Sequence, residues 1–305
     1  MKKDIYYQSC GTGKIHASIW EPDGEVKCIV QIVHGIAEHV ERYADFALYL
    51  NQHGCLVAAE DHMGHGLSAS SNDLGCFSGG WHSVAKDTQA LGKQLRDAYP
   101  GVPYVLLGHS MGSFIARTLL TYEDFQADAC ILSGTAWMPA VVLIAGKLLS
   151  SILCKFNGPK ARSPFMQNLM FGSYNKRIPN AKTEYDWLTN DPDVVDRYVA
   201  DPKCGFLVSV GLLKDMLTGL LYIQNKKNLI KMDKGLSVHF VAGEEDPVGN
   251  YGNGVKKAVV MFKKSGLSKV TCQLYPGKRH ELLNEDIKQQ VYADLLRYIN
   301  TVCEK

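Results

Sequence analysis

The amino-acid sequence predicts an α/β fold, with a mostly parallel sheet covered by helices on both faces and an inserted helical lid. Short runs rich in β-branched residues alternate with longer amphipathic segments along most of the chain, as is typical of parallel sheets. The alternation stops between Ser133 and Ser237, which indicates an insertion. A chain of 305 residues, 46% of them apolar, is long enough for one large domain that carries such an insertion.

The strands are expected from local runs of apolar residues. Residues 4–7 and 16–20 are separated by a Gly-Thr-Gly sequence, which predicts an antiparallel hairpin at one edge of the sheet. Residues 27–33 (KCIVQIV) form a nearly continuous apolar run, as in a strand buried on both faces. The other expected strands span residues 56–60, 104–107, 129–133, 237–243 and 269–274.

Amphipathic segments between these strands predict the covering helices. Gly54 ends the first of them, and Pro100-Gly101 ends the second, because glycine and proline interrupt the helical backbone. The expected helices span residues 43–53, 82–99, 111–122, 253–265 and 286–302.

The interval without alternation contains its own helical signals. Residues 141–156 and 206–223 are apolar helical stretches, and polar turns lie between them. A structureless loop of this length is uncommon in a compact domain. We therefore expect a helical lid at residues 137–234, inserted into a core formed by residues 1–136 and 235–305.

Composition narrows the choice of partners and compartment. The formal net charge is +2, so no strong field points to a nucleic acid partner. Nine cysteines are spread singly, which favours free thiols in a reducing compartment over a disulfide framework. The first residues lead into no apolar run, and no segment has the ~18 uncharged apolar residues of a spanning helix. We expect a cytoplasmic location, and the sequence makes no prediction of oligomeric state.

The strongest chemical signal is Gly108-His109-Ser110-Met111-Gly112. The motif follows an expected strand directly and opens an expected helix, which is the context of a nucleophile elbow. In that turn Ser110 is lifted above the carboxyl end of the sheet, and the helix N-terminus favours developing negative charge. The alternative is a serine that merely caps the helix in a glycine-rich turn.

A serine nucleophile needs a base and an acid that orients the base. In this fold the acid and then the histidine are expected after later strands. The first of these strands is followed by Glu244-Glu245-Asp246, and Pro247 favours a fixed geometry at Asp246. The second is followed by His280. The order predicts Ser110, Asp246 and His280 as the catalytic triad.

The loop that starts at His34 directly follows a strand and should supply a backbone N–H for the oxyanion. Ile36 and Met111 are the candidate donors. A metal cluster of His34, Glu38 and His39 is the alternative, and it lacks a clear fourth ligand. The residues expected to bind substrate are His34, Gly35, His109, Trp137 and Met138.

These residues resemble the lid-bearing α/β-hydrolases of the monoacylglycerol lipase and bacterial lysophospholipase type. The similarity rests on the nucleophile motif and on the following groups: His34 to His39 with Arg42-Tyr43, Asp61 with Gly64-His65-Gly66 and Ser68, Asp246-Pro247-Val248, Arg279-His280-Glu281 with Asn284-Glu285, and Asp186-Trp187-Leu188 with Asp201-Pro202-Lys203-Cys204-Gly205-Phe206 in the lid. The resemblance implies the same triad and the same oxyanion donors.

The expected function is hydrolysis of a lipid-like monoester, monoacylglycerol or lysophospholipid, without a metal or organic cofactor. Apolar lid residues from Trp137 to Leu149 could line an acyl tunnel and touch a membrane or micelle surface transiently, or they could simply pack the lid onto the core. A small-molecule carboxylesterase, a thioesterase and a serine aminopeptidase stay open on the same scaffold. The aminopeptidase would use acidic lid residues such as Glu184, Asp186, Asp191 and Asp193. A catalytically inert binding module is the alternative outside enzymes.

Overall fold

The computed structural model describes residues 1–303 and contains, within them, one eight-stranded sheet. The strand order is β1-β2-β4-β3-β5-β6-β7-β8. The pairs β1–β2 and β2–β4 are antiparallel, and every pair from β4 to β8 is parallel. The expected fold and its edge hairpin are thereby confirmed. The strands are β1 (Lys2–Gln8), β2 (Lys14–Trp20), β3 (Cys28–Val33), β4 (Cys55–Glu60), β5 (Tyr104–His109), β6 (Ala129–Ser133), β7 (Ser237–Gly243) and β8 (Val270–Tyr275).

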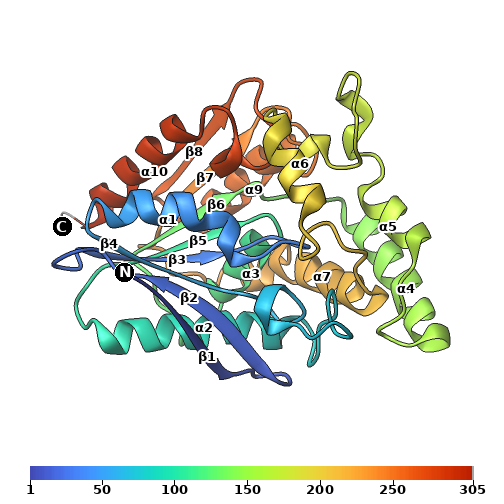
Figure 1. Ribbon diagram of the computed structural model, residues 1–305, viewed down its shortest axis with the longest axis horizontal. Coiled ribbons are helices and arrows are strands. Elements are labelled where there is room, and N and C mark those ends of the chain that lie inside the picture. Colours follow the sequence, from blue (N-terminus) through green and yellow to red (C-terminus); the bar gives the residue numbers. More distant parts are fainter. Residues whose placement is uncertain (304–305) are drawn as a thin grey trace.

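Helices cover both faces of the sheet (Figure 1). On one face Phe46 of α1 meets Tyr292 of α10, with ring centroids 4.8 Å apart. On the other face α2, α3 and α9 share a second hydrophobic cluster. The central strands are therefore buried on both sides, as their apolar runs predict. The helices are α1 (Ala44–Asn51), α2 (Trp81–Ala98), α3 (Met111–Leu119), α9 (Asn253–Lys264) and α10 (Lys288–Cys303).

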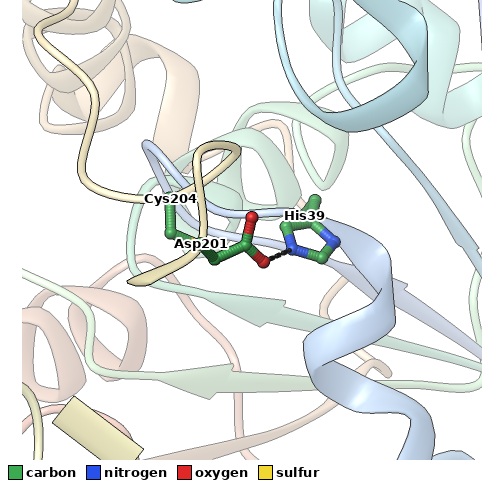
Figure 2. A group of neighbouring side chains, drawn as sticks. All are labelled: His39, Asp201 and Cys204. Carbon is green, nitrogen blue, oxygen red and sulfur yellow. Dashed lines mark hydrogen bonds and ion pairs between the residues drawn. The ribbon is translucent and has the colours of Figure 1, made fainter. Parts of the chain in front are cut away.

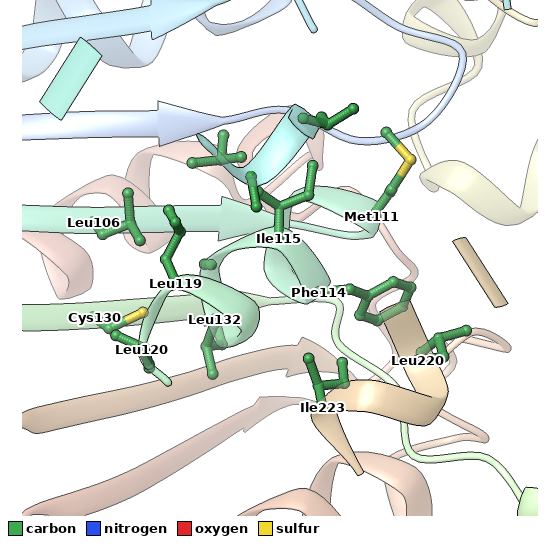
Figure 3. Close-up of a cluster of buried hydrophobic side chains, with 14 of the residues drawn as sticks. Leu106, Met111, Phe114, Ile115, Leu119, Leu120, Cys130, Leu132, Leu220 and Ile223 are labelled. Atoms are coloured by element: carbon green, nitrogen blue, oxygen red, sulfur yellow. The ribbon is translucent and has the colours of Figure 1, made fainter. Parts of the chain in front are cut away.

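Helix α3 lies between the sheet and a helix of the insertion, α7 (Val210–Ile223) (Figure 3). Phe114 on α3 lies close to Leu220 on α7, while Leu119 faces the strands. Each buried side chain of this size contributes about 1.5–3 kcal/mol relative to its exposed form. The helix that follows Ser110 is thus held from two sides.

The insertion begins after β6 and ends before β7. It leaves the sheet at the carboxyl end of β6, beside the carboxyl end of β5 where Ser110 lies. Figure 1 shows α4 and α5 at the end of the molecule opposite the two termini. The helices of the insertion are α4 (Ala140–Asn157), α5 (Pro164–Phe171), α6 (Pro192–Ala200), α7 (Val210–Ile223) and α8 (Lys226–Leu229). Short 3-10 turns are η1 (Val40–Tyr43), η2 (Gly66–Ser68), η3 (Tyr174–Arg177), η4 (Asp186–Leu188) and η5 (Leu282–Asn284).

Two capping residues explain where the insertion departs from the sequence expectation. The helix expected from residue 206 begins only at Val210, because the Ser209 hydroxyl accepts a hydrogen bond from Leu212 N–H at 3.1 Å. Helix α6 was not expected. It begins at Pro192, and the carboxylate of its N-cap, Asp191, accepts a hydrogen bond from Asp193 N–H at 3.0 Å.

Candidate active site

Ser110 occupies a strained turn between β5 and α3. Its backbone has φ 52° and ψ −121°, a conformation that L residues rarely adopt. The flanking glycines are required by space, since a Cβ on Gly112 would lie 1.9 Å from the Val33 carbonyl oxygen and one on Gly108 2.5 Å from the Gly112 carbonyl oxygen. The Ser110 hydroxyl makes no capping hydrogen bond to α3 within the described structure, so the capping interpretation is not supported.

Asp246 and His280 are brought together by two neighbouring strands, β7 and β8. His280 Nδ1 lies 3.0 Å from Asp246 Oδ2, and both side chains are buried. The other Asp246 oxygen accepts a hydrogen bond from Val248 N–H at 2.8 Å. Glu244 and Glu245, the two other acids considered, are exposed.

Two opposing effects set the protonation of His280. Burial alone disfavours the imidazolium and lowers its pKa, but the Asp246 carboxylate, aided by Glu281 and Glu38, more than offsets this. The pKa of His280 is therefore raised above its usual value. Its Nε2 atom has no hydrogen-bond partner among residues 1–303, and His280 and Ser110 line the same cavity. Nε2 is the ring atom left to exchange a proton there.

The loop after β3 lies directly against Ser110. A Cβ on Gly35 would be 3.1 Å from Ser110 Cβ, so glycine permits the close approach. No hydrogen bond to another described residue is found for the Ile36 or Met111 amide. Ala37 has a positive φ of 55°, and its carbonyl accepts from the Tyr198 hydroxyl at 2.8 Å. The insertion thus holds the loop that carries one expected oxyanion donor.

A cavity of about 430 Å³ opens above Ser110. This volume is in the range of small-molecule binding sites. Its floor comes from the core and its roof from the insertion. The lining residues are Gly35, Ile36, Ala37, Glu38, His109, Ser110, Pro164, Gln167, Asn168, Phe171, Gly172, Asn175, Thr183, Glu184, Tyr185, Trp187, Leu188, Tyr198, Gly205, Leu207, Val208, His280 and Glu281.

Most of the chain is similar to known proteins. The family model described as serine aminopeptidase S33 matches residues 24–287. The chain is 36% identical over 292 residues to the monoglyceride lipase of Rattus norvegicus, covering 92% of this chain and 84% of the relative. It is 27% identical over 299 residues to the monoacylglycerol lipase of Mycolicibacterium smegmatis, covering 96% and 95%. The chain belongs to the α/β-hydrolase family of the monoglyceride lipases.

Solved structures agree with this assignment. A thermostable carboxyl esterase from Bacillus coagulans superimposes with a TM-score of 0.92 at 31% identity, covering 99% of each chain. A lipase in an open form superimposes with a TM-score of 0.88 at 26% identity, covering 100% of each chain. The protein is therefore an enzyme of the serine hydrolase type, an esterase, and the expected family is confirmed.

A buried charge network joins the loop after β3 to the segment that carries His280. Arg42 bridges Glu38 at 2.7 Å and, through both guanidinium nitrogens, Glu281 at 2.6 and 2.5 Å. Burial raises the pKa of Glu281, but the Arg42 charge outweighs it, so the pKa is lowered overall. Glu38 also accepts from Gly35 N–H at 2.6 Å. The network joins the residue after His280 to the loop beside Ser110.

Only two of the five residues expected to bind substrate line the cavity. Gly35 and His109 line the cavity. His34 is fully buried, with Nδ1 2.7 Å from the Gly35 carbonyl oxygen, and does not line it. Trp137 and Met138 line a different hollow, so their placement at the substrate site is not supported.

Contacts to α3 and to the end of α7 keep Trp137 and Met138 away from the cavity. The Met138 amide donates to Gln224 Oε1 at 2.8 Å, at the end of α7, and Arg117 lies 5.6 Å from the Trp137 ring. These contacts draw the chain away from Ser110 before α4 begins.

The sequence did not single out Trp187 as part of the site. Its ring centroid lies 5.0 Å from that of His280, and Trp187 lines the cavity. The only sequence signal was the Asp186-Trp187-Leu188 motif, which the family resemblance already contained. Among the four acidic lid residues considered for an amine subsite, Glu184 alone lines the cavity. Asp186 and Asp191 instead accept hydrogen bonds from nearby backbone amides.

Proposed function

We propose that this esterase hydrolyses monoacylglycerols or similar lipid monoesters through an acyl-enzyme on Ser110. The observation that carries the proposal is that Ser110 and His280 line one cavity roofed by the insertion, with Asp246 3.0 Å from the other ring nitrogen of His280. Several relatives are named monoglyceride or monoacylglycerol lipases, which supports the lipid substrate.

In the proposed mechanism His280 Nε2 removes the Ser110 proton as the hydroxyl oxygen attacks the ester carbonyl. Asp246 orients the imidazole and stabilises its charged form. The Ile36 and Met111 amides donate to the oxyanion. His280 then protonates the leaving alcohol, and water activated by the same atom releases the fatty acid. Every proton passes through Nε2, the atom without a partner in the described structure.

The central experiment measures hydrolysis of monoacylglycerols and p-nitrophenyl esters of increasing acyl length. We expect long acyl chains to be favoured over acetyl, since the cavity extends from Ser110 into apolar residues of α5 such as Phe171. Ser110→Ala should abolish turnover and labelling by a fluorophosphonate. Ser70→Ala, on the surface, is the matched control.

A preference for acetyl esters in this panel would refute the lipid substrate while leaving the serine mechanism intact. A folded Ser110→Ala protein that keeps its activity would refute the nucleophile. Cleavage of aminoacyl p-nitroanilides in place of esters would favour the aminopeptidase.

We further propose that residues 137–234 act as a lid whose helix α4 touches the substrate-bearing membrane or micelle. By length and composition α4 could cross a membrane, whereas no spanning helix was expected from the sequence, and only 11% of it is buried. Leu143 and Ser150 are its buried residues. Val141, Ile144, Leu148, Ile152 and Phe156 are exposed. An apolar face of this size on a helix anchored by its other side favours contact with a lipid surface.

Vesicle flotation tests the lid contact. Replacing Leu148 and Phe156 together by serine should lower binding to phospholipid vesicles and hydrolysis of vesicle-borne monoacylglycerol, while turnover of soluble p-nitrophenyl acetate stays unchanged. Val260→Ser removes an exposed apolar residue from α9 and is the control. Equal vesicle binding by the double variant and the control would refute the contact.

We infer a cytoplasmic location, supported by the cysteine chemistry. No disulfide joins any two cysteines within residues 1–303, and seven of the nine are buried or half-buried. Thiols in this state fit a reducing compartment. Cell fractionation with an antibody against the protein tests the location.

A further inference from the structure

A second cluster of chemically active side chains lies outside the cavity at Ser110. It consists of His39, on the loop after β3, and Asp201 and Cys204, in the turn after α6 (Figure 2). One ligand atom from each lies within 4.8 Å of the other two. Within residues 1–303 this is the one group of at least three such side chains with metal-binding spacing. None of the three lines the cavity at Ser110.

The geometry of the cluster is partly fixed already. His39 Nε2 lies 2.8 Å from Asp201 Oδ2, although 162 positions separate the two residues in sequence. The other Asp201 oxygen accepts from Lys203 N–H at 2.8 Å, so the carboxylate is oriented by a neighbouring backbone group. The Cys204 thiol is buried and has no hydrogen-bond partner among the described residues. It is therefore free to coordinate without breaking an existing contact.

Imidazole nitrogen, carboxylate oxygen and thiolate sulfur together form a donor set suited to Zn²⁺. In a tetrahedral zinc site with bonds of about 2.0–2.3 Å, neighbouring ligand atoms lie roughly 3.5 Å apart. The His39–Asp201 pair is closer than that, and all three ligand atoms already lie within 4.8 Å of one another, so small side-chain rotations suffice. Three protein ligands leave one position for water.

The local charge favours a cation. Glu38, Glu281 and Asp201 are negative, and Arg42 and Lys203 are the positive side chains facing them. One negative charge remains while the Cys204 thiol is neutral, and coordination adds another by releasing the thiol proton to solvent. The Asp201 side chain is 32% exposed and provides the entry path for an ion.

We propose that His39, Asp201 and Cys204 bind one divalent transition-metal ion, Zn²⁺ in preference to Mg²⁺ or Ca²⁺, between the insertion and the loop after β3. The residue after Cys204, Gly205, donates its N–H to the Ala37 carbonyl at 3.0 Å. An ion at this place would fasten the lid turn to the loop that carries Ile36. The inference does not rest on the proposed substrate.

Metal binding is measured directly on untagged protein stripped with EDTA. Titration with Zn²⁺ against a chromophoric chelator should give one tight site per chain. Titration with Co²⁺ should give the near-ultraviolet absorption of a thiolate–cobalt bond. Because an ion that binds only the folded state stabilises it, the melting temperature should rise with Zn²⁺ and not with Mg²⁺.

Three ligand variants and two controls decide the assignment. His39→Asn, Asp201→Asn and Cys204→Ala should each weaken Zn²⁺ binding by about tenfold or more, and Cys204→Ala should also remove the thiolate absorption. Cys76→Ala, a cysteine equally buried at 7% exposure, and His53→Asn should change neither. Wild-type protein without a tight Zn²⁺ site, or ligand variants that bind like the controls, would overturn the proposal. If one ligand variant fails to fold, the remaining two decide the question.

Discussion

Replacing Asp246 by Asn isolates what its charge does for His280. The substitution keeps the shape of the side chain and removes the carboxylate that lies 3.0 Å from Nδ1. A hydrogen bond to a charged group contributes about 1.5–3 kcal/mol. Because this carboxylate stabilises the imidazolium, the pKa of His280 should fall when the charge is removed.

The sign of the effect on activity follows from the proposed role of His280 as a base. The neutral imidazole is the active form, so activity is present above the pKa of His280 and is lost as the pH falls through it. Asp246 raises that pKa against the effect of burial, so its removal should move the acid limb of the kcat/KM profile to lower pH.

The rate should fall at the same time. Loss of 1.5–3 kcal/mol of imidazolium stabilisation slows the chemical step by about 10- to 100-fold. A wrong tautomer of the imidazole would add to this, to about 10⁴-fold in the extreme.

Hydrolysis of a p-nitrophenyl ester between pH 5 and 9 measures both effects, with pH-dependent absorbance of the product corrected. Glu244→Gln removes a neighbouring but exposed carboxylate and is the control. An Asp246→Asn enzyme with wild-type kcat/KM, or with its acid limb at higher pH, would refute the role given to this pair.

Three further predictions concern stability and are checked by urea unfolding followed by circular dichroism. Arg42→Met should cost about 3–5 kcal/mol, because it leaves two buried carboxylates without their cation; a loss below 1 kcal/mol would contradict this. Phe114→Ala should cost about 3–5 kcal/mol by opening a cavity between α3 and α7, whereas Phe156→Ala on the exposed face of α4 should cost much less. Gly112→Ala should yield little folded protein, since its Cβ would collide with the Val33 carbonyl; normal expression and activity would show that the backbone can shift.

Much of the catalytic framework follows from short stretches of sequence. The elbow at Ser110 requires only a strand, two glycines and a helix start, all within a few residues of one another. The ends of β7 and β8 are likewise marked by local apolar runs, which places Asp246 and His280 at the same edge of the sheet. Parallel pairing of these strands then brings the two side chains together.

Tertiary structure alone decided the rest. Glu244, Glu245 and Asp246 are adjacent in sequence; Pro247 favoured Asp246, and the fold buries this acid against His280 while it leaves the two glutamates exposed. Trp137 was expected at the substrate site, but contacts to distant residues of α3 and α7 hold it and its neighbour elsewhere.

The contacts that form the roof of the site are also decided by tertiary structure. Trp187 on His280 and the His39–Asp201 contact join segments about a hundred or more positions apart, and no periodicity encodes such contacts. The sequence by itself determined the turn at Ser110 and the order of serine, acid and histidine along the chain, because helix and strand propensities and steric limits on the backbone act locally. Which side chains share a cavity depends on how the helices of the insertion pack against the sheet, and only the folded chain decides that.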